Sequence, residues 1–374
     1  MAAKLRAKEN SGGTPSSLDA WMAGKLSGAD AALPLPRRVE TAQLAALRRL
    51  LRYLSGYSPF YARRLAGHNP DLADLDDMAR LPCTDSTHLR EWRDFLCVSQ
   101  GDIQRMVSLR TSGTSGSPKR LAFTEKDLAA TRDFFRVGLS ELTSPGERLA
   151  VLLPGAERPD GVADQIRQAL SSLDIRVESP AHARIAGEQD TPESLADWVG
   201  QGKFHCLVAA PMQLRTLLHF FPQAPPPLRS VLAGADSLDP GLGLTLRAAW
   251  ACDLRDHYGL TESGYGLAVE CAAHDGYHMR ALDIFTEILD VESDAPLPPG
   301  CPGEVVITTL GREAMPLLRY RTGDLSSLLP GPCRCGSPMP RLGPIMGRIE
   351  RSPGQPPRLT RPPKGARSGA MEDL

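Results

Sequence analysis

The order of apolar and polar residues predicts two helices in the first third of the chain. The first begins near Val39 and has a stripe of leucines spaced i, i+3, i+7 and i+10, as on one face of a helix: Leu44, Leu47, Leu51 and Leu54. The second follows a short apolar strand at residues 121–123, where Thr124 and Asp127 have the Ser/Thr-x-x-Asp/Glu spacing that caps a helix N-terminus.

Further along, three short runs are apolar at every position and are bounded by turn residues. They span residues 149–153, 206–209 and 230–233. Strands that are buried on both faces have continuous apolar runs, whereas half-exposed strands alternate. The pattern therefore predicts an α/β fold with a buried, largely parallel sheet between helices. One such helix follows the first run and has an apolar face of Val162, Ile166, Ala169 and Leu170.

Both ends of the chain lack this patterning. Residues 1–38 are rich in Gly, Ser, Ala and Pro and predict a flexible arm, and residues 351–374 are dominated by Arg, Pro, Gly and Ser and predict a disordered tail. Residues 39–350 are long enough to form one large domain.

Overall charge and composition exclude several classes of protein. The 43 basic and 44 acidic side chains give a formal net charge of −1, which argues against nucleic-acid binding. No apolar run is long enough to span a bilayer, and the basic N-terminus has no apolar segment of a secretory signal. We therefore expect a cytoplasmic protein.

Residues 111–119 read Thr-Ser-Gly-Thr-Ser-Gly-Ser-Pro-Lys, a composition suited to binding phosphates. Glycines let the backbone approach an anion, hydroxyl and N–H groups donate to its oxygens, and lysine supplies a positive charge. A flexible surface turn is the alternative, and the spacing differs from the Gly-x4-Gly-Lys-Ser/Thr loop. The predicted phosphate-binding residues are Thr111, Ser112, Gly113, Thr114, Ser115, Gly116 and Lys119.

Two later segments favour phosphate binding over a flexible surface turn. Residues 258–262 read Tyr-Gly-Leu-Thr-Glu and residues 320–325 read Tyr-Arg-Thr-Gly-Asp-Leu. Together with residues 111–119, in this order, they resemble the AMP-forming acyl- and aryl-CoA ligases. Residues 57–61, 81–90 and 303–310 are similar to the phenylacetate–CoA ligase branch. The resemblance implies the large N-terminal domain of an adenylate-forming enzyme, in which sheets are layered with helices.

The resemblance also assigns roles to individual residues. Tyr258 would stack on adenine, Thr261 would contact the phosphates, Glu262 would bind Mg²⁺, and Asp324 would accept hydrogen bonds from the ribose. Taken singly, Tyr258 is equally consistent with a core aromatic, Asp324 with a turn residue and Glu262 with a solvated charge. The same resemblance places further residues at the nucleotide: Gly234, Ala235, Asp236, Gly259 and Arg348.

The acyl pocket is predicted less sharply. The branch resemblance implies that it is lined by the helix after residue 124, the turn at residues 209–211 and residues 263–267. Phe134, Phe135 and Tyr265 are candidate walls for an aryl or hydrophobic acid, and core packing is the alternative for the phenylalanine pair.

A second group of residues has the spacing of a metal site. Cys271-x2-His274 and Cys333-x-Cys335 offer two ligands each, and some phenylacetate–CoA ligase-like proteins have a similar pair, consistent with a structural zinc. His278 is an alternative ligand. Unrelated thiols beside a surface histidine are the alternative to a zinc site.

Family members continue beyond the pair Gly347-Arg348 into a small C-terminal domain that has a lysine for adenylation. Here Glu350 occupies the hinge position and Lys364 lies in a Pro-Pro-Lys-Gly setting. We therefore expect this chain to lack the small domain, or to receive it from another chain. Loss of one charge-stabilising donor would slow adenylation by about 10²–10³-fold.

The resemblance implies activation of a carboxylic acid by ATP and Mg²⁺ to an acyl-adenylate, with release of pyrophosphate, followed by thioester formation with CoA. Two alternatives stay open. One is transfer of the acyl group to the thiol of an acceptor or acyl-carrier protein, and the other is a non-catalytic relative that binds ATP or the acid. Supplying a separate small domain would distinguish the ligase from the acyl-protein synthetase, because only the ligase would then form acyl-CoA.

Overall fold

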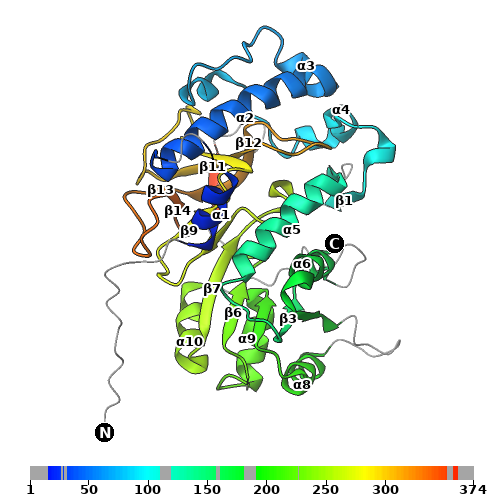
Figure 1. Cartoon of the computed structure of the whole chain (residues 1–374), viewed down its shortest axis with the longest axis vertical. Coiled ribbons are helices and arrows are strands. Elements are labelled where there is room, and N and C mark those ends of the chain that lie inside the picture. Colours follow the sequence, from blue (N-terminus) through cyan, green and yellow to red (C-terminus); the bar gives the residue numbers. More distant parts are fainter. Residues whose placement is uncertain are drawn as a thin grey trace.

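The computed structural model describes residues 16–26, 28, 32–109, 119–156, 161–180, 191–225, 227–351 and 357–360. Figure 1 shows two parts joined along helix α5: β3, β6 and β7 lie with α8–α10 in the lower part, and α2 and α3 cover β11 and β12 in the upper part. The described α-helices are α1 (Ser17–Lys25), α2 (Leu35–Tyr57), α3 (Pro59–Arg64), α4 (Trp92–Phe95), α5 (Glu125–Leu139), α6 (Val162–Leu170), α8 (Pro192–Gly202), α9 (Pro211–Phe220) and α10 (Pro240–Trp250).

The largest sheet has nine strands in the order β13-β14-β9-β8-β7-β6-β5-β3-β4. Its parallel half comprises β4 (Arg176–Glu178), β3 (Arg148–Leu152), β5 (Cys206–Ala209), β6 (Ser230–Ala233) and β7 (Asp253–Tyr258). Its antiparallel half continues through β8 (Ala268–Glu270), β9 (Tyr277–Met279), β14 (Arg341–Leu342) and β13 (Leu328–Leu329).

Helices cover both faces of the parallel half. Leu149 and Val151 of β3 pack with residues of α5 and α6, whereas Ala150 and Leu152 pack with residues of α8, α9 and α10. The same alternation holds along β5 and β6. Burial on both faces explains the continuous apolar runs, and the predicted parallel sheet is confirmed.

The second sheet is antiparallel and has five strands. Its order is β10 (Ile284–Leu289), β11 (Gly303–Thr309), β12 (Tyr320–Ser326), β15 (Gly347–Glu350) and β16 (Arg358–Thr360). Helix α2 packs on this sheet through the predicted stripe, with Leu47, Leu51 and Leu54 buried in the same core as Val305 and Ile307. A separate ribbon pairs β1 (Arg105–Leu109) with β2 (Lys119–Phe123).

The expectation of a flexible arm over residues 1–38 is wrong for its described part. Ser17–Lys25 forms helix α1, in which Leu18 and Met22 are buried, and helix α2 already begins at Leu35. Small residues made this segment look unstructured, but two well-spaced apolar side chains are enough to dock a short helix.

The expected disordered tail needs a similar correction. Arg358–Thr360 forms strand β16, which pairs with β15, and the pairing places Thr360 opposite Arg348. Backbone hydrogen bonds to an existing sheet edge order a strand whatever its composition. Residues 352–356 and 361–374 lie outside the described part of the chain.

Candidate active site

Two tyrosine–carboxylate hydrogen bonds join the nine-stranded sheet to the five-stranded sheet. Tyr258, at the end of β7, donates its hydroxyl to Asp324 Oδ2 on β12 at 2.8 Å. Tyr320, at the start of β12, donates its hydroxyl to Glu262 Oε1 at 2.9 Å. All four side chains are buried. Burial and the adjacent carboxylate raise the pKa of each tyrosine well above 10, so both phenols remain protonated donors.

Each of these carboxylates also faces a cation. Lys119 Nζ lies 3.2 Å from Glu262 Oε1, and Arg348 Nε lies 3.4 Å from Asp324 Oδ1. Burial raises the pKa of Asp324, and the Arg348 guanidinium opposes that rise. Lys119 is largely buried, whereas Arg348 is exposed. The structure thus brings residues from distant parts of the sequence into two groups of three: Lys119, Glu262 and Tyr320, and Tyr258, Asp324 and Arg348.

The predicted phosphate-binding segment falls in residues 110–118, outside the described part of the chain. Thr111, Ser112, Gly113, Thr114, Ser115 and Gly116 belong to it, and their roles stay predictions. The residues on either side of the segment are placed: Leu109 of β1 pairs with Lys119 of β2. Lys119, the first described residue after the segment, contacts Glu262.

The predicted nucleotide turns lie at the ends of β6 and β7. Gly234, Ala235, Gly259 and Thr261 line the same cavity. A Cβ at Gly259 would lie 2.6 Å from the Tyr265 carbonyl oxygen, so only glycine fits there.

Asp236 does not line this cavity. It is exposed, and its Oδ1 accepts a hydrogen bond from the Ser237 N–H at 2.8 Å. The turn at residues 209–211 is also not among the lining residues.

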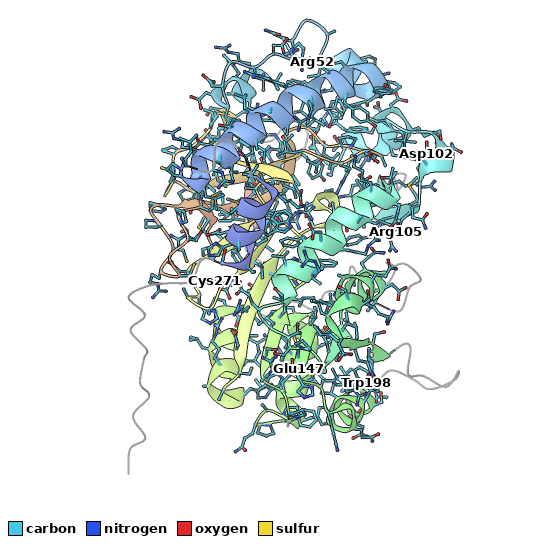
Figure 2. All side chains as sticks on the ribbon, in the orientation of Figure 1. Arg52, Asp102, Arg105, Glu147, Trp198 and Cys271 are labelled. Atoms are coloured by element: carbon cyan, nitrogen blue, oxygen red, sulfur yellow. The ribbon has the colours of Figure 1, made fainter. Side chains whose placement is uncertain are left out.

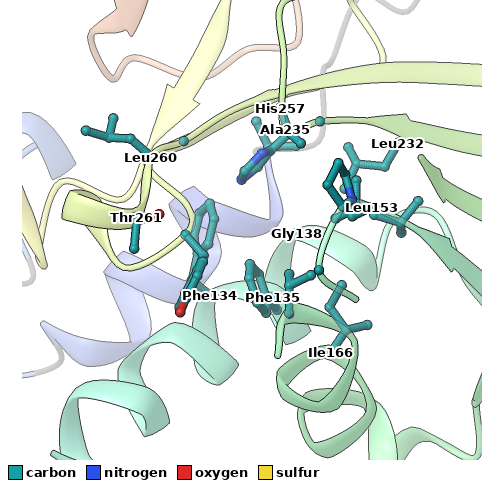
Figure 3. A pocket seen from close by; sticks show the side chains of 18 of the residues that line it. Phe134, Phe135, Gly138, Leu153, Ile166, Leu232, Ala235, His257, Leu260 and Thr261 are labelled. Carbon is teal, nitrogen blue, oxygen red and sulfur yellow. The ribbon is translucent and has the colours of Figure 1, made fainter. Parts of the chain in front are cut away.

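The cavity has a volume of about 230 Å³ and lies between the parallel strands and helices α5 and α6. Figure 3 shows Phe134 and Phe135 from α5 and Ile166 from α6 facing Leu232 and His257 on the strand side. Other walls come from Leu139, Leu153, Val162, Val208, Tyr265 and Val269. The two phenylalanines thus both pack in the core and line a cavity. Such a surface is suited to an apolar ligand.

Four basic residues at this site were not found from the sequence: Arg105, His257, Arg280 and Arg312. Burial, helped by the Arg280 charge, lowers the pKa of His257 to about 4, so this cavity-lining imidazole is neutral at pH 7. Arg312 Nη1 donates to the Glu262 carbonyl at 2.8 Å, and Arg280 Nη2 donates to the Ser263 carbonyl at 2.7 Å.

The two buried guanidinium groups therefore fix the backbone at the Thr-Glu motif through hydrogen bonds to the carbonyl oxygens of Glu262 and Ser263. Burial lowers the pKa of Arg312 to about 10. Each guanidinium also lies over an aromatic ring, Arg312 over Phe123 at 4.8 Å and Arg280 over Phe134 at 5.2 Å. No sequence signal marks them, because Arg312 follows its partner by 50 residues.

A separate cluster combines three thiols and one imidazole. The ligand atoms of Cys271, His278, Cys333 and Cys335 all lie within 4.8 Å of one another. Cys271 Sγ is 3.7 Å from Cys333 Sγ, and Cys335 Sγ is 3.6 Å from His278 Nε2. Tetrahedral zinc with bonds of about 2.0–2.3 Å requires ligand separations of roughly this size. Figure 2 places Cys271 at the left side of the molecule, away from Arg105 at the cavity.

The structure does not bring His274, the predicted fourth ligand, to the thiols, and the alternative, His278, lies beside them instead. His274 has a positive φ of 48°, and its Nδ1 lies 3.3 Å from Glu270 Oε2. The tight turn therefore directs this imidazole away from the thiols. His278 lies on β9, where it is buried and faces Cys335.

Comparison with curated proteins identifies the family. The chain is 30% identical over 350 residues to the phenylacetate–coenzyme A ligase of Thermus thermophilus, an alignment that covers 84% of this chain and 72% of the relative. The chain belongs to the phenylacetate–coenzyme A ligase family. The enzyme of the same name from Pseudomonas putida is 29% identical over 338 residues, which cover 82% of this chain and 70% of that protein. The resemblance read from the motifs is thereby confirmed.

A family model described as AMP-binding enzyme matches residues 179–312, which include the Tyr-Gly-Leu-Thr-Glu motif of this ligase-family chain. Among solved structures, 2-hydroxyisobutyryl-CoA ligase in complex with 2-HIB-AMP and CoA has a TM-score of 0.73 at 22% identity. That comparison covers 86% of this chain and 73% of the other. It confirms the predicted fold of an adenylate-forming ligase.

No described helix of this family member has both the length and the apolar character that crossing a bilayer would require.

Proposed function

We propose that this chain activates an aryl or other hydrophobic carboxylic acid with ATP and transfers the acyl group to CoA. The observation that carries the proposal is the position of two buried carboxylates, each held by a phenol and a cation, beside an apolar cavity. The relatives from Thermus thermophilus and Pseudomonas putida are both named phenylacetate–coenzyme A ligase, which supports this reaction. The cavity lining supports an apolar acid.

In the first step an oxygen of the substrate carboxylate attacks the α-phosphorus of ATP in line, and the bond to pyrophosphate breaks. Such a displacement needs positioning and charge neutralisation more than covalent chemistry. Lys119 supplies positive charge at the phosphates, Asp324 accepts the ribose hydroxyls, and Arg348 contacts the ribose or the α-phosphate. Thr261 and the segment at residues 111–116 donate hydrogen bonds to phosphate oxygens.

In the second step the thiol sulfur of CoA attacks the acyl carbon and AMP leaves, while the thiol proton passes to solvent. We assign the acyl group to the cavity between α5, α6 and the parallel strands. Its His257 is neutral, and the guanidinium of Arg105, which also lines the cavity, donates a hydrogen bond to the Tyr265 hydroxyl at 3.0 Å. The nucleotide then lies over Gly234, Ala235 and Gly259.

Glu262 is the carboxylate that we assign to Mg²⁺. Its contacts with Lys119 and Tyr320 both use Oε1, and we assign the metal to Oε2. A single carboxylate together with substrate phosphates is a usual way for proteins to bind this ion. Bound Mg²⁺ would neutralise phosphate charge during the displacement.

We also propose a structural zinc at Cys271, His278, Cys333 and Cys335. Four protein ligands leave no open position, so the ion would close the fold between β9 and the segment before β14 rather than take part in the reaction.

Acid-dependent exchange of labelled pyrophosphate into ATP tests the first step. We expect exchange with aryl and medium-sized hydrophobic acids, and its loss in Glu262→Gln because the carboxylate charge is removed. Glu193→Gln, at an exposed position on α8, is the matched control and should retain exchange. Equal exchange in both variants would refute the role of Glu262. No exchange with any acid, despite ATP binding, would refute the proposed activity of this chain.

A further inference from the structure

Several buried polar atoms have no hydrogen-bond partner within the described residues, and two groups among them are complementary. They are Nδ1 of His278 and the carboxylate of Asp19, both of whose oxygens are unpaired. One is a ring nitrogen that can donate, and the other can only accept. Buried groups without partners are costly, so a pair of complementary groups in one region calls for an explanation.

The proton on His278 can be assigned from the geometry of the cluster. Its Nε2 lies 3.6 Å from Cys335 Sγ and so faces the metal position. A metal ion bound to Nε2 takes that lone pair, which puts the ring proton on Nδ1. Histidine ligands almost always donate this second N–H to a carboxylate, a carbonyl or water.

Asp19 is the carboxylate best placed to accept it. Met22, one turn after Asp19 in α1, packs with Ala281 and Met339, which lie close in the chain to His278 and Cys335. Other charged groups near the ring are already committed. Arg341 Nη1 and Asp275 Oδ2 pair at 2.6 Å, and Glu141 accepts the Ser17 N–H and an ion pair from Arg255.

The start of α1 also adjoins the cluster directly. A cavity of about 10 Å³ lies between Ser16, Ser17 and Leu18 on one side and Cys271 and His278 on the other, and its wall also contains the charged residues Glu141, Arg255 and Glu270. This space is about the size of one water molecule. Asp19 follows these three residues in the first turn of the same helix.

We propose that Asp19 accepts the hydrogen bond of His278 Nδ1 through one water when the cluster holds zinc. Asp19 is then a positioning residue that ties helix α1 to the metal site. The inference rests on the structural zinc proposed above.

The link extends to the wall of the acyl cavity. Ser17 Oγ donates to the Val137 carbonyl at 3.2 Å, and Trp21 Nε1 donates to Asp133 Oδ2 at 2.7 Å. Val137 and Asp133 belong to α5, which also contributes Phe134 and Gly138 to the cavity. Zinc bound at the cluster would therefore affect the acyl cavity through helices α1 and α5, although the cluster and the cavity share no residue.

The test compares Asp19→Asn and Asp19→Ala with wild type in two measurements. Zinc affinity is measured by chelator competition, and hydrogen exchange of the backbone amides in residues 17–25 is measured with and without zinc. We expect affinity to fall by about 10–100-fold in Asp19→Ala, with a smaller loss in Asp19→Asn, whose amide oxygen still accepts. Zinc should slow exchange in α1 of wild type but not of Asp19→Ala.

Asp133→Asn is the matched control, because it weakens the contact of α1 with α5 without touching His278. We expect its zinc affinity to stay within a few-fold of wild type. Thiolate charge-transfer bands of the cobalt-loaded variants check that all the ligands still assemble. Wild-type affinity in Asp19→Ala, with zinc still protecting α1, would overturn the role of Asp19. Failure of wild type to bind zinc would overturn the metal site itself.

Discussion

Substituting Gly138 with alanine would change the size of the acyl cavity while improving the helix that forms its wall. Gly138 is the penultimate residue of α5 and lines the cavity. A Cβ added there meets a single atom within 4 Å, Val269 Cγ1 at 3.8 Å, which is ordinary van der Waals contact. The methyl group therefore fits without strain and occupies space that a ligand would otherwise fill.

The added methyl group is expected to affect both the stability of the fold and the selection of the acid. Replacing a helical glycine by alanine stabilises the fold by roughly 0.5–1 kcal/mol. A methyl-sized change in an apolar pocket alters discrimination between ligands by about 1–3 kcal/mol, or roughly 10–200-fold in kcat/KM. We expect Gly138→Ala to be at least as stable as wild type and to lose activity selectively with the bulkiest acids it accepts.

Gly56→Ala is the matched control, because Gly56 is the penultimate residue of α2, is exposed, and has no atom within 4 Å of an added Cβ. Denaturant unfolding measures stability, and pyrophosphate exchange with acids of increasing size measures specificity. Both variants should gain stability, and only Gly138→Ala should change the order of acids. An unchanged order in Gly138→Ala would refute the assignment of the cavity to the acid.

Two further predictions concern the metal cluster and pH. Cys333→Ser should lose stoichiometric zinc by metal analysis while His274→Ala retains it, and the opposite result would restore His274 as the ligand. Burial raises the pKa of Asp256 to about 7 from an ordinary value of 3.8, so the folded state favours the protonated carboxyl. The stabilisation that comes from protonating Asp256 is therefore lost as pH rises through about 7. Asp256→Asn should therefore gain up to about 4 kcal/mol over wild type between pH 4 and pH 8 in denaturant unfolding, and a pH-independent difference would contradict this.

The parallel sheet was predictable because its determinants are local. Strands β3, β5 and β6 lie within one residue of the predicted apolar runs, and helix α5 begins at the predicted cap, where Thr124 and Asp127 bond reciprocally. Both features depend on neighbours along the chain, which the sequence displays directly.

Features that depend on distant contacts were not predictable in this way. The short spacing of Cys271 and His274 favoured His274, whereas the imidazole that lies beside the thiols is His278, because a positive φ at His274 turns the chain before β9 brings His278 to them. The buried guanidinium groups of Arg280 and Arg312 have partners in the Thr-Glu motif that only tertiary folding brings near. Helix α1 was missed because its stability comes from docking rather than from its own propensity.

The tyrosine–carboxylate pairs lie at the seam between two sheets, whereas the acyl cavity is walled by α5, α6 and the parallel strands. Under the proposed assignment, the helix residues that would select the acid are distinct from the tyrosine–carboxylate pairs that would hold the nucleotide, and Gly234, Ala235, Gly259 and Thr261 lie where the two regions meet. Energies of substitutions in separate, non-contacting groups add nearly independently. A lineage with this architecture can change its range of acids through α5 and α6 while leaving the nucleotide-binding machinery intact.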